Sequence, residues 1–157
     1  MASPSRPDDA AAMLRTCVAA AKVDGSVCAF LEPIALYHTR DLYEEGDGGW
    51  LATPTAGHVP LGSARTYGDG HDLTILTWGN GLLMSLRVAR RLEQRGIQTR
   101  VVDLRWLAPL PIEDIGEAPD RWLVIGPDRA GNLLELVVLV DQRDAIVTHA
   151  LPPRPKH

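Results

Sequence analysis

One stretch, residues 72–110, constrains the fold of this chain more than any other. It reads DLTILTWGNGLLMSLRVARRLEQRGIQTRVVDLRWLAPL. A strand-like run at 73–78 leads through a Gly-Asn-Gly turn into an amphipathic helix over 82–95, which Gly96 ends. A second strand-like run follows at 99–104. Because the crossover contains a helix, this order predicts a βαβ unit with two parallel strands and a right-handed connection.

Apolar runs continue this pattern toward the C-terminus. Residues 122–125 (WLVI) predict a third strand, and residues 145–149 predict a fourth. Residues 133–140 are apolar throughout and fit either a helix over the sheet or a strand. Residues 112–117 predict a short helix. The fold class that follows is α/β, with a short parallel sheet flanked by helices.

The N-terminal part has a different pattern. An alanine-rich helix is predicted over residues 9–22, with Asp8 or Asp9 as its cap and an apolar side that includes Met13 and Cys17. Residues 27–31 form a short continuous apolar run, which predicts a buried strand. Pro33 ends that strand because it has no N–H for a sheet ladder.

Between residues 37 and 70 the sequence shows few patterns typical of helices or strands. A structureless loop of this length is unusual inside a compact domain, so we expect a linker that packs on a neighbouring domain or subunit. Residues 57–67 within it predict a short edge strand, with Pro60 near its start.

Composition limits the classes of function. The chain has 157 residues, which suits one domain, and a net charge of −4 offers no basic stripe for nucleic acid. Its start lacks the pattern of a signal peptide, and no apolar run reaches the ~20 residues of a membrane span. We therefore expect a cytoplasmic protein with no nucleic-acid or membrane partner. Two cysteines, Cys17 and Cys28, make no disulfide framework and are expected to be reduced, buried and inert.

The Gly-Asn-Gly turn is a candidate anion site. Gly79, Asn80 and Gly81 open a predicted helix, where free backbone N–H groups and the positive helix end favour an anion. The alternative is a tight turn that needs small residues. The dinucleotide fingerprint is incomplete, because no third glycine follows.

Four other residues are candidate contact residues. His38 and Arg40 lie just after the predicted strand at 27–31, where packing or a subunit contact is the simplest role. Asp103 and Arg105 end the second strand, where α/β sheets often place functional groups, although an ion pair or loop brace is simpler. The five histidines show no metal-ligand spacing, and no nucleophile elbow is present. We assign no catalytic residue and no metal ligand.

Several segments, taken in order, resemble a known family. From about Ser3 to about Ile125 the chain is similar to the transketolase-like beta subunits of thiamine-dependent 2-oxo acid dehydrogenases, of the pyruvate or branched-chain type. The segments are SPSRPDDAAAMLRTCV, FLEP at 30–33 followed by Leu36-Tyr37, residues 61–64, DLTILTWGNG, RVVDLRWLAPLP and RWLVI.

The resemblance implies a domain organisation. Residues 1–36 would be a remnant of the family's pyrimidine-binding domain, and residues 37–70 a linker. Residues 71–157 would form a domain like the transketolase carboxy-terminal domain, truncated because the expected last helix and Gly pair are missing. In the family this domain joins two beta subunits and docks the acyltransferase core, which makes an alpha-type subunit, a second beta subunit and a dihydrolipoyl acyltransferase core the implied partners.

The resemblance also implies what the chain lacks. The family holds thiamine diphosphate and Mg²⁺ with parts that have no counterpart here, including the cofactor-activating glutamate and an active-site histidine. Gly46-Asp47-Gly48 has no Asn pair after it. We therefore expect a fragment or subunit that binds no cofactor alone and contributes assembly to the oxidative decarboxylation of a 2-oxo acid, with acyl transfer to a lipoyl group. The alternatives are a stand-alone, non-catalytic interaction module and a degenerate, truncated gene product.

Overall fold

The computed structural model describes residues 1–111, 122–127, 133–141 and 144–151. The helix expected at 112–117 lies outside the described residues. The elements are α1 (Pro7–Asp24), the short 3-10 helix η1 (Ile34–Leu36), β1 (Arg65–Tyr67), β2 (Leu73–Thr77), α2 (Asn80–Glu93), β3 (Thr99–Asp103), β4 (Trp122–Pro127), β5 (Leu133–Asp141) and β6 (Asp144–Leu151).

The strands form one six-stranded sheet in the order β1-β3-β2-β4-β5-β6. The predicted βαβ unit is confirmed, because β2 and β3 run parallel on either side of α2 in the chain. β4 extends the parallel part on the other side of β2. The sheet is mixed, however, since β1, β5 and β6 pair antiparallel with their neighbours. The apolar run at 133–140, which fitted a helix or a strand, is a strand.

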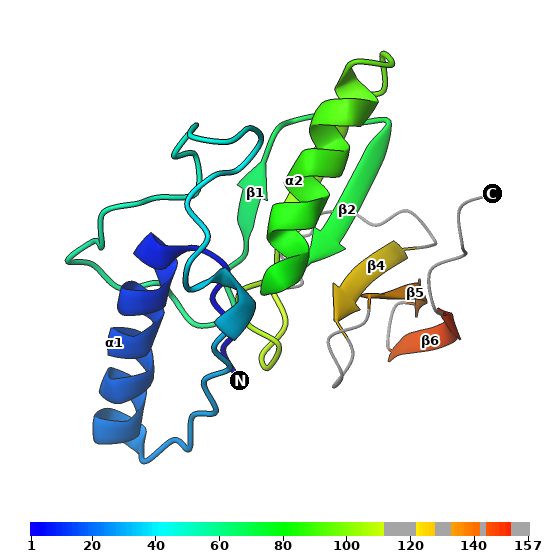
Figure 1. Cartoon of the computed structure of the whole chain (residues 1–157). Coiled ribbons are helices and arrows are strands. Elements are labelled where there is room, and N and C mark those ends of the chain that lie inside the picture. The colour runs from blue at the N-terminus through cyan, green and yellow to red at the C-terminus, as the bar shows by residue number, and fades with distance from the viewer. Residues whose placement is uncertain (112–121, 128–132, 142–143, 152–157) are drawn as a thin grey trace.

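Helix α2 lies along one face of the sheet, as Figure 1 shows. Its leucine stripe packs with the sheet and the linker, and the shared core consists of Trp50, Ile75, Leu82, Leu86, Ala89 and Val101. Burying a leucine side chain contributes about 1.5–3 kcal/mol, so this stripe fixes which face of α2 meets the sheet. A smaller cluster on the sheet contains Leu76, Val102 and Leu104.

Helix α1 begins differently from the prediction. The cap position is Arg6, with no side-chain cap, and Pro7 is the first helical residue. Asp8 and Asp9 lie inside the first turn, where their charges favour the positive helix end. Because the helix already begins at Pro7, neither can occupy the cap position, and their carboxylates pair with arginines elsewhere in the chain. Gly25 ends the helix in the left-handed conformation, with φ 74°.

The prediction of a buried strand at residues 27–31 is wrong. The segment has only an isolated bridge, between Phe30 and Ala2. Val27 is 100% exposed and Leu31 is 45% exposed. Ala2 also bridges Trp106, so the first residues of the chain lie between this segment and the end of the βαβ unit.

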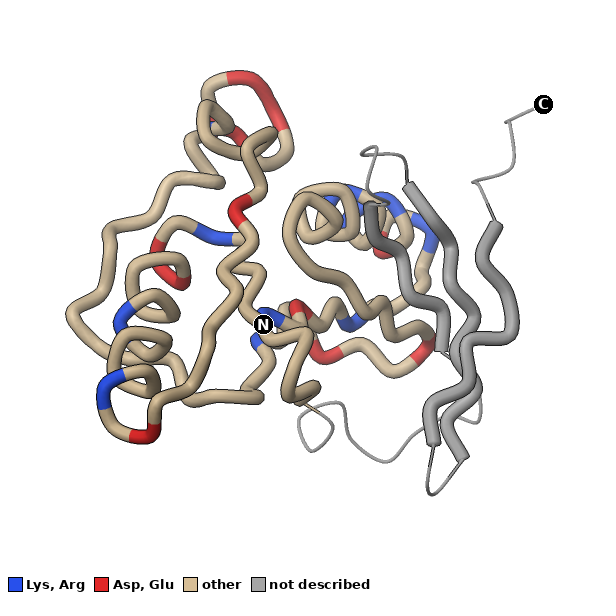
Figure 2. The backbone as a smooth tube through the Cα atoms, turned by 90° about the horizontal axis from the view of Figure 1, so that it is seen from below, with Lys and Arg blue, Asp and Glu red and all other residues tan. Residues whose placement is uncertain are grey.

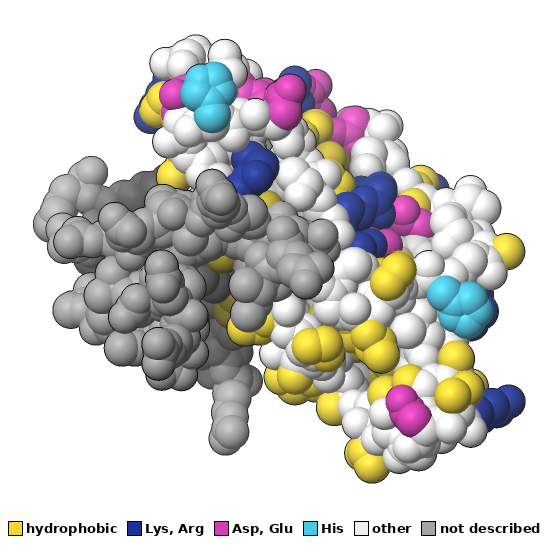
Figure 3. All heavy atoms as spheres, turned by 180° about the vertical axis from the view of Figure 1, so that it is seen from behind, with side chains coloured by type: hydrophobic (Ala, Val, Ile, Leu, Met, Phe, Trp, Pro, Cys, Tyr) yellow, Lys and Arg dark blue, Asp and Glu magenta, His cyan; other side chains and the backbone are white. Residues whose placement is uncertain are grey.

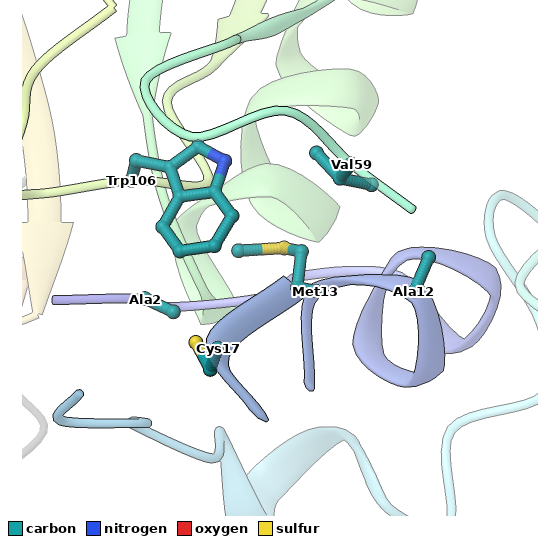
Figure 4. Packing of buried hydrophobic residues seen from close by; sticks show 6 residues of the cluster. All are labelled: Ala2, Ala12, Met13, Cys17, Val59 and Trp106. Atoms are coloured by element: carbon teal, nitrogen blue, oxygen red, sulfur yellow. The ribbon is translucent and has the colours of Figure 1, made fainter. Parts of the chain in front are cut away.

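A small core joins α1 to the rest of the chain. It consists of Ala2, Ala12, Met13, Cys17, Val59 and Trp106. In Figure 4, Met13 points from α1 toward the Trp106 ring. The buried Met13 and Trp106 side chains come from segments far apart in the sequence, so this cluster holds the N-terminal helix against the segment that follows β3.

The linker at residues 37–70 packs on its own chain at several points. Asp47 accepts backbone hydrogen bonds from residues 42, 43, 44 and 49, and Asp41 accepts two more from Gly46 and Gly48. These bonds hold the pKa of Asp47 below its usual range, with the Gly49 N–H as the largest contribution. Arg87 of α2 donates to the Leu42 carbonyl, so the loop is fastened to that helix.

Candidate functional site

A largely buried group of polar and charged residues connects α1, β1 and the end of β3. We call it the charge junction. It consists of Ser5, Asp8, Asp9, Arg65, Asp103 and Arg105. Charged residues of both signs meet beside the N-terminus, between α1 and the sheet, in Figure 2. The members come from three separate segments, so the junction forms only when these segments are folded together.

Arg105 links α1 to the segment before β1 through hydrogen bonds of its guanidinium group. Its Nη1 donates to Asp9 Oδ1 at 3.1 Å, and its Nη2 donates to the Ala64 carbonyl at 2.6 Å. Its Nε donates to the Ser63 carbonyl at 3.1 Å. Arg105 has a positive φ of 56°, which is rare for a residue with a side chain. The turn after β3 thereby directs the guanidinium back toward α1 and the linker.

A second arginine completes the ion pairs. Arg65 Nη1 lies 2.8 Å from Asp8 Oδ2 and 3.1 Å from Asp9 Oδ2. Asp9 is therefore shared by Arg65 of β1 and Arg105. Because a buried charge is costly without partners, these pairs favour one arrangement of α1 on the linker and the sheet.

Asp103 lies at the C-terminal end of β3 and is 0% exposed. Its Oδ1 accepts hydrogen bonds from Ser5 Oγ at 2.9 Å and from the Arg105 backbone N–H at 3.3 Å. Its Oδ2 has no partner among the described residues. Burial raises the pKa of Asp103 to about 7, and the nearby Asp9 charge adds to the rise. The group therefore titrates close to neutral pH.

The structure separates the predicted contact residues into two pairs. Asp103 and Arg105 are both buried and make contacts within this chain. Arg105 pairs with Asp9 and meets the Asp103 carboxylate only through its backbone N–H. His38 and Arg40 are exposed. A role in contacts between subunits remains a prediction for all four.

His38 lies at a hollow of about 410 Å³ between α1 and η1. Phe30, Pro33 and Trp50 give this hollow apolar walls, and Glu32 lines it as well. The Tyr37 hydroxyl hydrogen bonds to Glu32, which raises the pKa of Tyr37. The lining of the hollow thus includes a histidine and a carboxylate.

The Gly-Asn-Gly turn lies close to the N-terminal segment of the chain. Gly79 has φ 54°, and a Cβ there would lie 3.3 Å from Ser3 Oγ. The N–H groups of Gly81 and Leu82 donate to the Trp78 and Gly79 carbonyls at 3.1 and 3.2 Å. These are the bonds of a tight turn. An anion site at Gly79, Asn80 and Gly81 remains a prediction.

The described residues offer no cluster of ligands for the metal that accompanies thiamine diphosphate. They include no group of three or more His, Cys, Asp or Glu side chains that could hold a metal ion. All four carboxylate oxygens of Asp41 and Asp47 accept backbone N–H groups of their own loop. We therefore derive no step through this cofactor from this chain. Within the described part of the chain, no helix is both long and apolar enough to cross a bilayer.

Sequence reasoning missed most of the charge junction. Ser5, Asp9 and Arg65 showed no recognisable motif, because their partners are far away in the sequence. One available signal was the pair of acidic residues, Asp8 and Asp9, in the first turn of an alanine-rich helix.

Comparison with known proteins shows which protein family this chain resembles. A model of the transketolase C-terminal domain matches residues 62–126. The 2-oxoisovalerate dehydrogenase subunit beta of Bacillus subtilis (strain 168) is 30% identical over 142 residues, covering 87% of this chain and 39% of that protein. The pyruvate dehydrogenase E1 component subunit beta of Acholeplasma laidlawii is 25% identical over 163 residues, covering 97% of this chain and 44% of that protein.

A third relative shows the same partial coverage. The pyruvate dehydrogenase E1 component subunit beta of Bacillus subtilis (strain 168) is 35% identical over 114 residues, covering 71% of this chain and 31% of that protein. The chain thus spans less than half the length of these curated relatives. It carries a transketolase C-terminal domain and is a relative of the transketolase-like beta subunits of 2-oxo acid dehydrogenases.

Proposed function

We propose that this chain contributes the scaffold and assembly part of a 2-oxo acid dehydrogenase beta subunit. The parent reaction is the oxidative decarboxylation of a 2-oxo acid with thiamine diphosphate and Mg²⁺, followed by acyl transfer to a lipoyl group. Other polypeptide sequence supplies the cofactor chemistry. The partners are an alpha-type subunit, a second beta subunit and, through them, the acyltransferase core.

The observation that carries this proposal is an exposed apolar surface on the N-terminal part. We call it the apolar edge. It consists of Leu14, Val18, Val27, Leu31 and Ile34, all of which are exposed large hydrophobic residues. Hydrophobic side chains gather on this part of the molecule in Figure 3. Exposed apolar side chains of this kind can take part in a protein–protein contact.

The backbone at the apolar edge points to a polypeptide partner. The Ala29 carbonyl accepts from the Ala2 N–H, and the Leu31 N–H donates to the Ala2 carbonyl, both at 2.8 Å. Because successive peptide groups of an extended segment alternate in direction, the N–H and C=O of Phe30 face the opposite side. Among the described residues they have no hydrogen-bond partner. Free backbone groups of this kind can hydrogen bond to an extended segment of another chain.

This surface also accounts for the wrong prediction at residues 27–31. The apolar run is typical of a buried strand, and a partner strand along Phe30 would bury it. The match to a relative covers 97% of this chain, so it includes the N-terminal part as well as the transketolase C-terminal domain.

A matched pair of variants tests the proposal. Leu31→Glu places a charge on the apolar edge, and Val88→Glu places one on α2 at nearly the same exposure, 44% against 45%. The alpha-type and beta subunits of a related dehydrogenase are co-expressed with each tagged variant, and the captured complex is quantified. We expect Leu31→Glu to lose at least about tenfold in affinity, because burying an unpaired charge costs more than 1.4 kcal/mol, while Val88→Glu binds like the native chain.

A turnover assay separates the proposal from catalysis by this chain alone. The purified chain is incubated with thiamine diphosphate, Mg²⁺, a branched 2-oxo acid or pyruvate, and an artificial electron acceptor. We expect no turnover above the protein-free control. Turnover that depends on the cofactor would assign the chemistry to this chain and overturn the scaffold role. Equal capture of both variants would remove the apolar edge as the assembly surface.

A further inference from the structure

The two cysteines of the chain meet in space. Cys17 lies in the second half of α1, and Cys28 lies 11 positions later in the exposed segment after that helix. Cys28 Sγ is 3.6 Å from the Cys17 carbonyl oxygen, to which it donates. Both thiols are free, and Cys28 packs against the core cluster that contains Cys17.

The two thiols differ in access to solvent. Cys17 is 5% exposed, within the cluster of Met13 and Trp106. Cys28 is only half-buried, and the residues on either side of it are exposed. Burial, followed by the contact with Cys28, raises the pKa of the Cys17 thiol. A dissolved oxidant therefore meets Cys28 first, while Cys17 stays protected until Cys28 has reacted.

We propose that Cys17 and Cys28 form a reversible intramolecular disulfide by exchange with a small-molecule disulfide such as oxidised glutathione. This inference does not depend on the proposed function. The sequence alone predicted reduced, buried and inert thiols because two cysteines make no disulfide framework, whereas Cys28 is only half-buried. The fold creates the pair by turning the chain back at Gly25, so that the extended segment runs beside α1.

The exchange proceeds in two balanced steps. The Cys28 thiolate attacks one sulfur of oxidised glutathione, which forms a mixed disulfide and releases one glutathione thiolate. The Cys17 thiolate then attacks Cys28 Sγ, which closes the protein disulfide and releases the second glutathione thiolate. Two protein thiols are oxidised and one glutathione disulfide is reduced, and the two protons lost from the cysteines end on the two released glutathione molecules.

The disulfide would fasten the segment that carries the apolar edge to α1. In the reduced chain this segment is held by its two hydrogen bonds to Ala2 and by packing of Cys28 and Phe30 on the cluster. A covalent link closing this short loop limits the freedom of the unfolded chain, so the oxidised form is expected to melt at a higher temperature.

Intact mass and peptide mapping test the proposal on the native chain. The chain is equilibrated with oxidised glutathione, trapped with a thiol-alkylating reagent and weighed. We expect the loss of two hydrogens and no alkylation. Trypsin cleaves after Arg15, Lys22 and Arg40, so the disulfide must link peptide 16–22 to peptide 23–40. Two alkylated thiols after equilibration, or dimers linked between chains, would overturn the proposal.

Single variants test the order of attack. Cys17→Ala leaves the accessible thiol without its partner, so it should accumulate a stable glutathione adduct at Cys28. Cys28→Ala leaves only the buried thiol, so it should remain unmodified over the same time. Equal labelling of the two variants would contradict the assigned order. Because the decisive measurement uses the native chain, a variant that folds poorly does not affect it.

Discussion

The charge junction makes a quantitative prediction about Asp103→Asn. In the folded chain burial raises the pKa of Asp103 from 3.8 to about 7. Below its unfolded-state pKa the Asp103 carboxyl group is protonated in both the folded and the unfolded chain, so it does not lower the free energy of unfolding. As pH rises from about 4 to about 7, unfolding lets the group ionise while the folded state holds it neutral, so stability falls. Above pH 7 the loss is complete.

The size of this effect follows from the shift. A rise of about three pKa units at ~1.36 kcal/mol per unit corresponds to about 4 kcal/mol, taken as an upper bound for a buried group. Asparagine is neutral at every pH. It can still accept from Ser5 Oγ and the Arg105 N–H, so the variant should lack this decline and exceed the native chain in stability at pH 8.

The assay is urea unfolding followed by circular dichroism at several pH values between about 2 and 8, so that the range includes the ionisation of both aspartates. Asp47→Asn is the control of opposite sign, because the pKa of Asp47 is lowered by four backbone N–H groups. That carboxylate stabilises the fold above its unfolded pKa, and its contribution is lost as pH falls further. If Asp103→Asn and the native chain have parallel pH profiles, Asp103 is ionised in the fold and the reasoning is refuted.

Two further substitutions probe the fold by chemical denaturation. Gly70→Ala should destabilise by at least about 2 kcal/mol, because its Cβ would lie 2.2 Å from the Thr99 backbone nitrogen, whereas Gly57→Ala, with nothing within 4 Å, should change stability by less than about 0.5 kcal/mol. Equal effects would contradict this close approach of the segment before β2 to β3. Arg105→Lys should cost about 2 kcal/mol, because a lysine cannot reproduce the guanidinium bonds to Asp9, Ser63 and Ala64. A neutral result would show that the junction does not hold the N-terminal part.

The sequence predicted the βαβ unit well because local signals there agree with one another. The glycine turn, the leucine stripe of α2 and the two strand-like runs all specify the same arrangement. The packing of residues 27–31 could not be predicted in the same way. Their apolar character is local, but whether they are buried depends on what lies beside them.

The charge junction could not be predicted from the sequence either, because its members pair with residues far away in the chain. Arg105 and Asp9 are 96 positions apart, and Arg65 and Asp8 are 57 apart. No periodicity links such residues, so only the fold reveals the pairs. The same holds for Cys17 and Cys28, whose spacing matches no motif although the turn after α1 brings them together.

The central claim is that this chain contributes assembly rather than chemistry, and native mass spectrometry tests it most directly. The purified chain is mixed with the alpha-type and beta subunits of a related 2-oxo acid dehydrogenase, and the masses of the complexes are recorded. The account predicts a complex that contains this chain in a fixed ratio and is lost on Leu31→Glu but kept on Val88→Glu. A chain that remains free in the mixture, with its partners fully assembled without it, would contradict the account.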